Sequence, residues 1–192
     1  MNENSDVETY GESKVLGLPW DKTMDTLTVP FPQGETPSTK REVLKQLAKV
    51  YDPLGLVTPL TLQGKMIYSD ICNQKLPWDA ALTRPLMERV MKWKQTLPTG
   101  ETVLRPVENH REPVLELGLH AFGDTSTYGV GAAVYAVVRQ QAGTTQRLAP
   151  AKGRLAKQGL TVPRLEFISA HMATNLVTNV KNTLNILPTL KV

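Results

Sequence analysis

The spacing of hydrophobic residues changes once along the chain. Between residues 39 and 97, apolar residues recur every three or four positions, which is typical of amphipathic helices. From Val114 onward they form runs of strand length that are separated by turn residues. The pattern therefore predicts a hairpin of residues 16–21 and 26–30, helices that begin at Thr39, Thr58 and near Pro85, strands at 114–122, 128–139 and 147–152, and a helix from Thr161 to Pro188.

Short signals mark the predicted helix starts. Thr39 and Glu42 have the spacing of a capping box, in which each side chain bonds the backbone N–H of the other residue. Thr58 and Thr161 are each followed by a proline within two residues, which is typical of an N-cap and the first helical turn. We therefore expect Thr58 and Thr161 to be N-cap residues.

The order strand, strand, strand, helix after Val114 predicts an α+β fold. We expect three regions along the chain: a polar N-terminus with the hairpin (1–36), a small helical region (37–100) and a β-β-β-α unit (101–192). The change of hydrophobic period near Val114 is the main reason for separating the last region from the helices.

Composition narrows the class of protein. Hydrophobic residues make up 41% of the chain, so it can bury a core. Because Cys72 is the single cysteine and the N-terminus lacks a secretory signal, we expect an intracellular, cytoplasmic protein without disulfides. The longest apolar run, residues 130–138, is far shorter than the roughly 20 residues that cross a bilayer, so we expect no membrane association.

The formal net charge of +4 conceals an uneven distribution. Residues 139–192 contain eight basic residues and one acidic residue. Such a surface attracts polyanions through the release of counterions, although a basic face that only improves solubility remains an alternative. The candidate nucleic-acid-binding residues in this segment are Arg147, Lys152, Arg154, Lys157 and Arg164.

Two carboxylates are placed for metal chemistry. Asp124 ends a strand that we expect near the centre of the sheet, and Glu166 lies in the first turn of the last predicted helix. If that helix packs across the sheet, the two side chains approach each other and offer the oxygen ligands that Mg²⁺ requires. Simpler roles stay open: Asp124 can start a turn, and Glu166 can complement the helix dipole.

Eight short segments and Trp93 carry a family resemblance, in this order: VLGLPWD (15–21), KREVL (40–44), YDPLGL (51–56), LPWD (76–79), Trp93, HAFGDTS (120–126), YGVGAAVY (128–135), AKGRLA (151–156) and VPRLE (162–166). Together they resemble the Pol polyprotein of BEL/Pao-type LTR retrotransposons, in the region known as the Pao retrotransposon peptidase. The resemblance runs from about residue 14 to residue 184.

The resemblance implies a fragment that links reverse transcriptase to ribonuclease H. The hairpin then looks like the end of a polymerase palm, the helices look like its thumb or connection, and the β-β-β-α unit looks like the truncated first half of a ribonuclease H domain. Asp124 and Glu166 correspond to two Mg²⁺ ligands of that domain. The implied partners are an RNA–DNA hybrid or other nucleic acid and the remainder of the Pol polyprotein, with virus-like particles as an implied location.

That resemblance also implies an incomplete enzyme. Two-metal hydrolysis uses ions held by several carboxylates, and the later acidic ligands of the ribonuclease H fold would follow Val192. We therefore expect the isolated chain to be inactive. The alternatives are an aspartic peptidase that pairs Asp124 in a homodimer, since residues 124–126 resemble Asp-Thr-Gly, and a non-catalytic nucleic-acid-binding or assembly segment.

Overall fold

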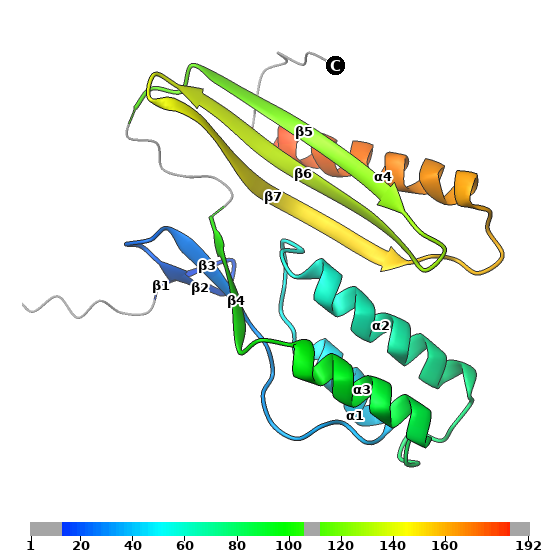
Figure 1. The fold of residues 1–192 in the computed structure, drawn as a ribbon. Helices are drawn as coiled ribbons and strands as arrows, with labels where there is room; N and C mark the ends of the chain where they lie inside the picture. Colours follow the sequence, from blue (N-terminus) through cyan, green and yellow to red (C-terminus); the bar gives the residue numbers. More distant parts are fainter. Residues whose placement is uncertain (1–12, 106–111, 185–192) are drawn as a thin grey trace, which may run out of the picture.

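The computed structural model describes residues 13–105 and 112–184, so the predicted polar N-terminus and the predicted helix end at Pro188 lie outside the described residues. In chain order the elements are β1 (Ser13–Val15), β2 (Leu18–Asp21), β3 (Thr26–Pro30), α1 (Lys40–Ala48), α2 (Thr58–Asn73), α3 (Arg84–Thr96), β4 (Gly100–Leu104), β5 (Glu116–Thr125), β6 (Gly129–Gln140), β7 (Gly143–Leu155) and α4 (Val162–Thr183). Figure 1 shows α4 behind the long strands β5–β7 and the helices α1–α3 grouped below them.

The first sheet has the order β1-β2-β3-β4. Its β2–β3 pair confirms the hairpin that the sequence predicts. The sequence pattern does not reveal β4, because this strand pairs with β3, which lies far earlier in the chain, from Thr26 opposite Leu104 to Pro30 opposite Gly100. The helices α1, α2 and α3 therefore lie in the segment between β3 and β4, and the pairing of these two strands brings the ends of that segment together. The boundaries of the three expected regions stay a prediction.

An ion pair fixes the end of β4. Arg105 donates two hydrogen bonds to the Asp25 carboxylate, at 2.6 and 3.1 Å, and Trp20 Nε1 donates a third at 2.9 Å. The bonds from Arg105 are the main reason that the pKa of Asp25 lies below its usual value, against the opposing effect of burial. The charge of Arg147 on β7 lowers this pKa further, so the first sheet and β7 are close neighbours.

The helical core confirms the spacing in residues 39–97. Thr39 and Glu42 form the predicted capping box at the start of α1. Trp93 of α3 is 1% exposed, and its Nε1 donates a 3.0 Å hydrogen bond to Leu60 O of α2. The buried hydrophobic residues of this core are Val43, Ile67, Ile71, Leu82, Leu86, Val90 and Trp93.

The start of α2 differs from the prediction. Val57 is the N-cap, Thr58 is the first helical residue, and no side chain of the cap position bonds the helix start. The Asp52 carboxylate instead accepts hydrogen bonds from Leu56 N at 2.8 Å and Val57 N at 2.9 Å. The turn at residues 52–55 lets this aspartate fold back on the helix, so the capping charge comes from six residues before Thr58. Thr161 is the N-cap of α4 as predicted, although its side chain makes no capping hydrogen bond.

The second sheet has the order β5-β6-β7, followed by α4. This confirms the predicted strand, strand, strand, helix order and the α+β fold. It corrects the expected position of the first strand, because β6 lies at the centre and β5 lies at the edge. α4 covers one face, where the buried residues are Val130, Ala132, Leu165, Met172 and Ala173. On β5 and β6, Phe122 and Tyr135 are exposed and form an edge-to-face pair with ring centroids 5.9 Å apart.

The opposite side of this sheet contacts the helical region at Gly129 of β6 and Gly153 of β7, and at Gly55 in the turn before α2. A Cβ atom at Gly153 would lie 2.4 Å from Thr58 Cγ2, and one at Gly129 would lie 2.9 Å from Leu62 Cδ2, so α2 packs directly on β6 and β7. Ala151 N of β7 donates a 2.8 Å hydrogen bond to Leu54 O. Next to it, a Cβ atom at Gly55 would lie only 1.9 Å from Ala151 O. We call these contacts the α2–β7 junction.

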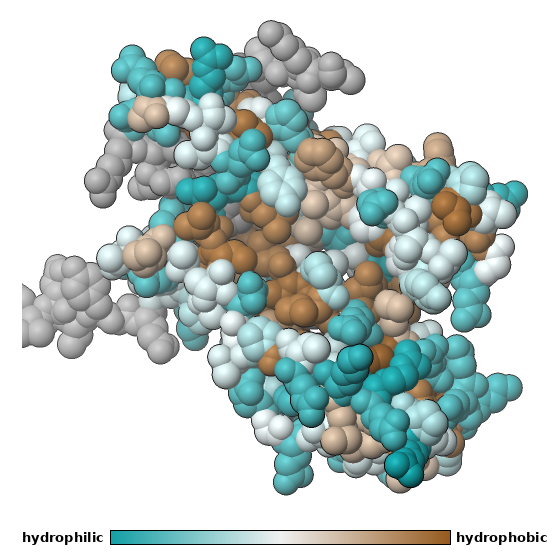
Figure 2. Space-filling view, viewed as in Figure 1, coloured by the Kyte–Doolittle hydropathy of each residue, from teal (hydrophilic) through white to brown (hydrophobic). Residues whose placement is uncertain are grey.

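Hydrophobic residues also gather where the first sheet meets β7. Leu148 of β7 packs against a cluster that includes Leu27, Phe31 and Leu56. In Figure 2 the hydrophobic residues are concentrated at the centre of the molecule, between the long strands and the elements below them. Within the described ranges, no helix has both the length and the apolar character that crossing a membrane requires.

Candidate functional site

Asp124 is the last residue but one of β5 and is exposed. It pairs with Gly131 of β6, and its Oδ1 accepts a 2.8 Å hydrogen bond from the backbone N of Thr125. Gly123, the preceding residue, faces α4, because a Cβ atom there would lie 2.6 Å from Ser169 O. Since side chains alternate along a strand, the Asp124 side chain leaves β5 on the face away from α4.

The turn after Asp124 has its own hydrogen bonds. Ser126 N donates to Gly129 O at 2.8 Å, and Ser126 Oγ accepts from the backbone N atoms of Tyr128 and Gly129, both at 3.2 Å. The sequence Asp-Thr-Ser is therefore explained locally as a strand end followed by a serine-stabilised turn. This local role accounts for the serine that stands in place of the glycine of an aspartic peptidase.

Glu166 is exposed and lies on α4, but not in its first turn as predicted. The helix begins at Val162, so Glu166 is its fifth residue. The backbone O of Glu166 accepts a 2.8 Å hydrogen bond from Ser169 Oγ. The backbone of Ser169 and Ala170, about one turn after Glu166, lies against Gly123 of β5. The structure thus brings the helix that carries Glu166 to the strand that carries Asp124.

Both carboxylates are placed at one end of the sheet, on neighbouring elements. Among the described residues, β5 is an edge strand of this sheet. Asp124 points away from α4, so Glu166 would have to reach around the edge of β5 to share an ion with it. This differs from the expectation that a helix packed across the sheet brings the two side chains together. Within the described residues, neither carboxylate has an ion pair, and no three His, Cys, Asp or Glu side chains are grouped closely enough to hold a metal ion.

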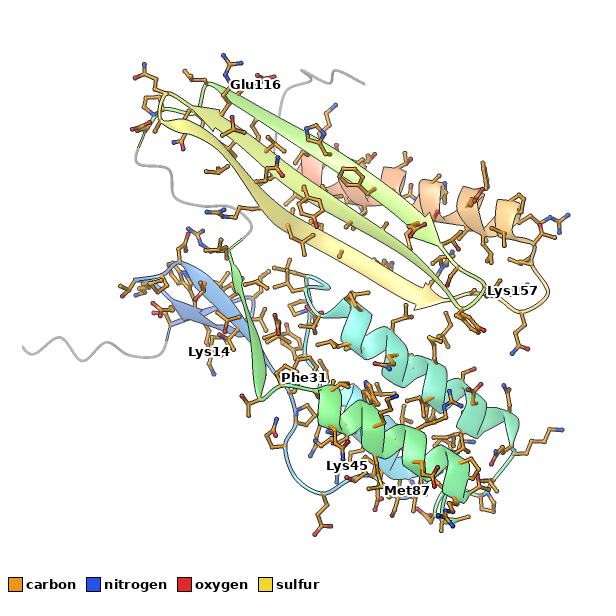
Figure 3. All side chains as sticks on the ribbon, viewed as in Figure 1. Lys14, Phe31, Lys45, Met87, Glu116 and Lys157 are labelled. Carbon is orange, nitrogen blue, oxygen red and sulfur yellow. The ribbon has the colours of Figure 1, made fainter. Side chains whose placement is uncertain are left out.

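Four of the five predicted nucleic-acid-binding residues gather at the same end. Lys152 and Arg154 are exposed near the end of β7, opposite Ala132 and Val130, so both project on the α4 side of the sheet. Lys157, labelled at the tip of the sheet in Figure 3, is exposed in the connection to α4. Arg164 is exposed in the first turn of α4. These four residues are called the basic end of the sheet below.

Arg147 lies apart from the basic end. It is half-buried near the first sheet, where its charge lowers the pKa of Asp25. Its Nη1 donates a 3.2 Å hydrogen bond to Gln146 O. Arg147 thus already has neighbours within the protein, which the sequence alone does not indicate.

The contact between Gly123 and α4 holds the strand of Asp124 against the helix of Glu166. The sequence pattern does not indicate this role of Gly123. We expect Gly123→Ala to destabilise the protein by about 1–3 kcal/mol, because the new methyl group meets the backbone of Ser169 and must displace the helix. Gly118→Ala on the same strand is the control, since the atom nearest to its Cβ position is His120 Nε2 at 3.4 Å, an ordinary van der Waals contact. Urea unfolding of both variants measures the difference; equal stabilities would contradict this close packing.

The fold and this sheet end together define a class of protein. A three-stranded antiparallel sheet followed by a helix that covers one face, with acidic residues on the first strand and the helix, is typical of the RNase H-like α+β class. A family model described as the Pao retrotransposon-like RNaseH-like domain matches residues 39–191, and the chain therefore belongs to this family. This confirms the resemblance to a Pao-type Pol region. A search of curated proteins finds no match.

The matched residues include the helices α1–α3 as well as β5–β7 and α4. The match begins at Thr39, the N-cap of α1. The helical region and the sheet are thus parts of one family sequence, as expected for elements that pack through the α2–β7 junction.

Proposed function

We propose that this chain supplies Asp124 and Glu166 to an Mg²⁺ site that hydrolyses the RNA strand of an RNA–DNA hybrid, within a retrotransposon Pol polyprotein. The observation that carries the proposal is the placement of two exposed carboxylates without ion-pair partners in the described chain, on a strand and a helix that meet at one end of an RNase H-like sheet. Family membership supports this reaction class.

The two carboxylates fit a hard divalent cation in ligand type. Both are anionic oxygen donors, and the described residues give neither of them a lysine or arginine that would have to be displaced. Bound Mg²⁺ would supply the positive charge that activates a water molecule and stabilises the leaving oxygen. Asp124 and Glu166 would orient this charge at the sheet end, and Thr125 N holds one oxygen of Asp124.

Two carboxylates do not complete such a site. Two-metal hydrolysis depends on several ligands that hold both ions, and the described residues contain no group of three suitable side chains. We propose that the remaining ligands come from polypeptide outside these 192 residues, and that the chain is inactive without it.

The substrate and the neighbouring enzyme follow from the same proposal. The basic end lies at the same end of the sheet as both carboxylates, with Lys152 and Arg154 on the α4 side, and is suited to contact the phosphates of the hybrid. Residues 13–105 would link this unit to a reverse transcriptase, since the α2–β7 junction ties the helical region to the sheet.

Cleavage of a labelled RNA–DNA hybrid tests the proposal. With Mg²⁺, we expect the 192-residue chain to give no cleavage above background and a longer polypeptide from the same reading frame to cleave the RNA strand. The physical reason is that only the longer protein can complete the ligand set.

The aspartic peptidase alternative predicts the reverse. The 192-residue chain would then dimerise and cut peptides at acidic pH without metal, and cleavage would depend on Asp124 but not on Glu166. That result would overturn the proposal, as would a longer polypeptide that binds the hybrid and leaves it intact in Mg²⁺.

A further inference from the structure

The carboxylates of the helical region are already engaged. Residues 37–100 contain ten basic and five acidic residues. Glu42 accepts hydrogen bonds from the backbone of Ser38 and Thr39, and Asp52 accepts them from Leu56 and Val57. The other three acids form ion pairs with arginines: Asp70 with Arg89, Asp79 with Arg41, and Glu88 with Arg84. The lysines of this region therefore lack carboxylate partners within the described chain.

Three of these lysines converge on one surface. Lys45 lies on α1, where it is labelled in Figure 3, and Lys49 follows one turn later as the C-cap. From α3, the Lys94 ammonium donates a hydrogen bond to Pro32 O. Gln46 Nε2, between the two α1 lysines, donates to the same oxygen at 2.9 Å. We call Lys45, Lys49 and Lys94 the lysine cluster.

The like charges of the lysine cluster repel one another. Burial, and after it the positive charge of Lys49, holds the pKa of Lys94 below its usual value. Lysines one helical turn apart also destabilise a helix. The dipole of α1 stabilises Lys45 at its own helix end, and that of α3 does the same for Lys94. The arrangement therefore favours an anion that neutralises several charges together.

We propose that the lysine cluster binds the phosphate backbone of a nucleic acid, as a second binding surface separate from the basic end of the sheet. The proposal rests on the proposed function, because it assigns a further contact to the same polyanion. Lysines spaced by one helical turn suit a polymer with regularly repeated charges better than a single phosphate. The α2–β7 junction connects the two basic surfaces, so a bound duplex that touches both gains affinity from each.

A charge-matched comparison tests the lysine cluster. The 192-residue chain and its Lys45→Gln/Lys49→Gln variant are titrated with a labelled RNA–DNA hybrid at several salt concentrations. The control is Lys14→Gln/Lys65→Gln, which removes the same charge from exposed lysines on β1 and α2. Lys94 is left unchanged because it holds Pro32. Circular dichroism verifies that all variants are folded.

We expect the cluster variant to bind roughly tenfold more weakly at moderate salt, and its slope of log affinity against log salt to shrink by about 1.8, or 0.9 for each lost phosphate contact. The control should keep most of the affinity and slope. A cluster variant that behaves like the control would overturn the inference.

A third variant separates this inference from the proposed function. If Arg154→Gln/Arg164→Gln weakens binding and the cluster variant does not, the lysine cluster is excluded while hybrid binding at the basic end stands. If the unmodified chain shows no salt-dependent binding to the hybrid, this inference fails, whereas the proposed function is decided by cleavage with the longer polypeptide. Binding to phosphatidylserine vesicles that is lost in the cluster variant, with hybrid binding unchanged, would overturn the inference in favour of a lipid surface.

Discussion

Gly55→Ala should be among the most destabilising single substitutions in this protein, with a loss of about 3 kcal/mol or more in the free energy of unfolding. Gly55 has a φ of 73°, a left-handed conformation that costs other residues about 1–2 kcal/mol. The added methyl group would also stand 1.9 Å from Ala151 O, so the turn and β7 must separate. That movement breaks the hydrogen bond from Ala151 N to Leu54 O.

Gly159→Ala isolates the conformational part of this cost. Gly159 has a φ of 81°, close to that of Gly55, but nothing lies within 4 Å of its Cβ position. The control should therefore lose only about 1–2 kcal/mol. Thermal unfolding followed by circular dichroism compares the two variants, and a loss of 3 kcal/mol corresponds to a midpoint lower by roughly 6–12 °C. If both variants unfold at the same temperature, the α2–β7 junction does not contribute as described.

Asp124→Asn and Glu166→Gln should each reduce hybrid cleavage by a longer, active polypeptide by about a hundredfold or more. Each change removes one anionic ligand while the size of the side chain is nearly kept. Asp124→Asn retains an oxygen that can accept the hydrogen bond from Thr125 N, so the strand end should remain intact. The expected loss is therefore in catalysis rather than in folding.

Initial rates of hybrid cleavage at several Mg²⁺ concentrations measure this effect, with thermal unfolding as the test of folding. Glu88→Gln is the control, because it neutralises an exposed carboxylate on α3 that pairs only with Arg84. A variant at Asp124 or Glu166 that retains full activity would remove that residue from the proposed metal site.

Sequence periodicity predicted the elements whose stabilising contacts are local. The capping box at Thr39, the helical faces of α1–α3 and the order of β5–β7 and α4 all follow from residues close together in the chain. The strand β4 and the cap that Asp52 provides were missed, because their partners depend on how distant or bent segments fold.

The candidate site was predictable in its residue types but not in its orientation. The positions of Asp124 and Glu166 on a strand and a helix followed from the sequence pattern and the family resemblance. The directions of the two side chains could not be predicted. Which β5 residues face α4 depends on the close packing of Gly123 against that helix, which the sequence pattern does not show. Likewise, the charge of Arg147 gave no sign that this residue neighbours Asp25 in the fold.

The outer side of β5 leaves a row of backbone hydrogen-bonding groups open, since no strand pairs with it among the residues that the structure describes. Exposed strand edges recruit other extended polypeptides, including copies of the same chain. A polypeptide that pairs there would run about 4.8 Å from β5 and pass directly beside Asp124. The polypeptide that pairs with this edge therefore determines whether the chains self-associate. It also determines which side chains surround Asp124.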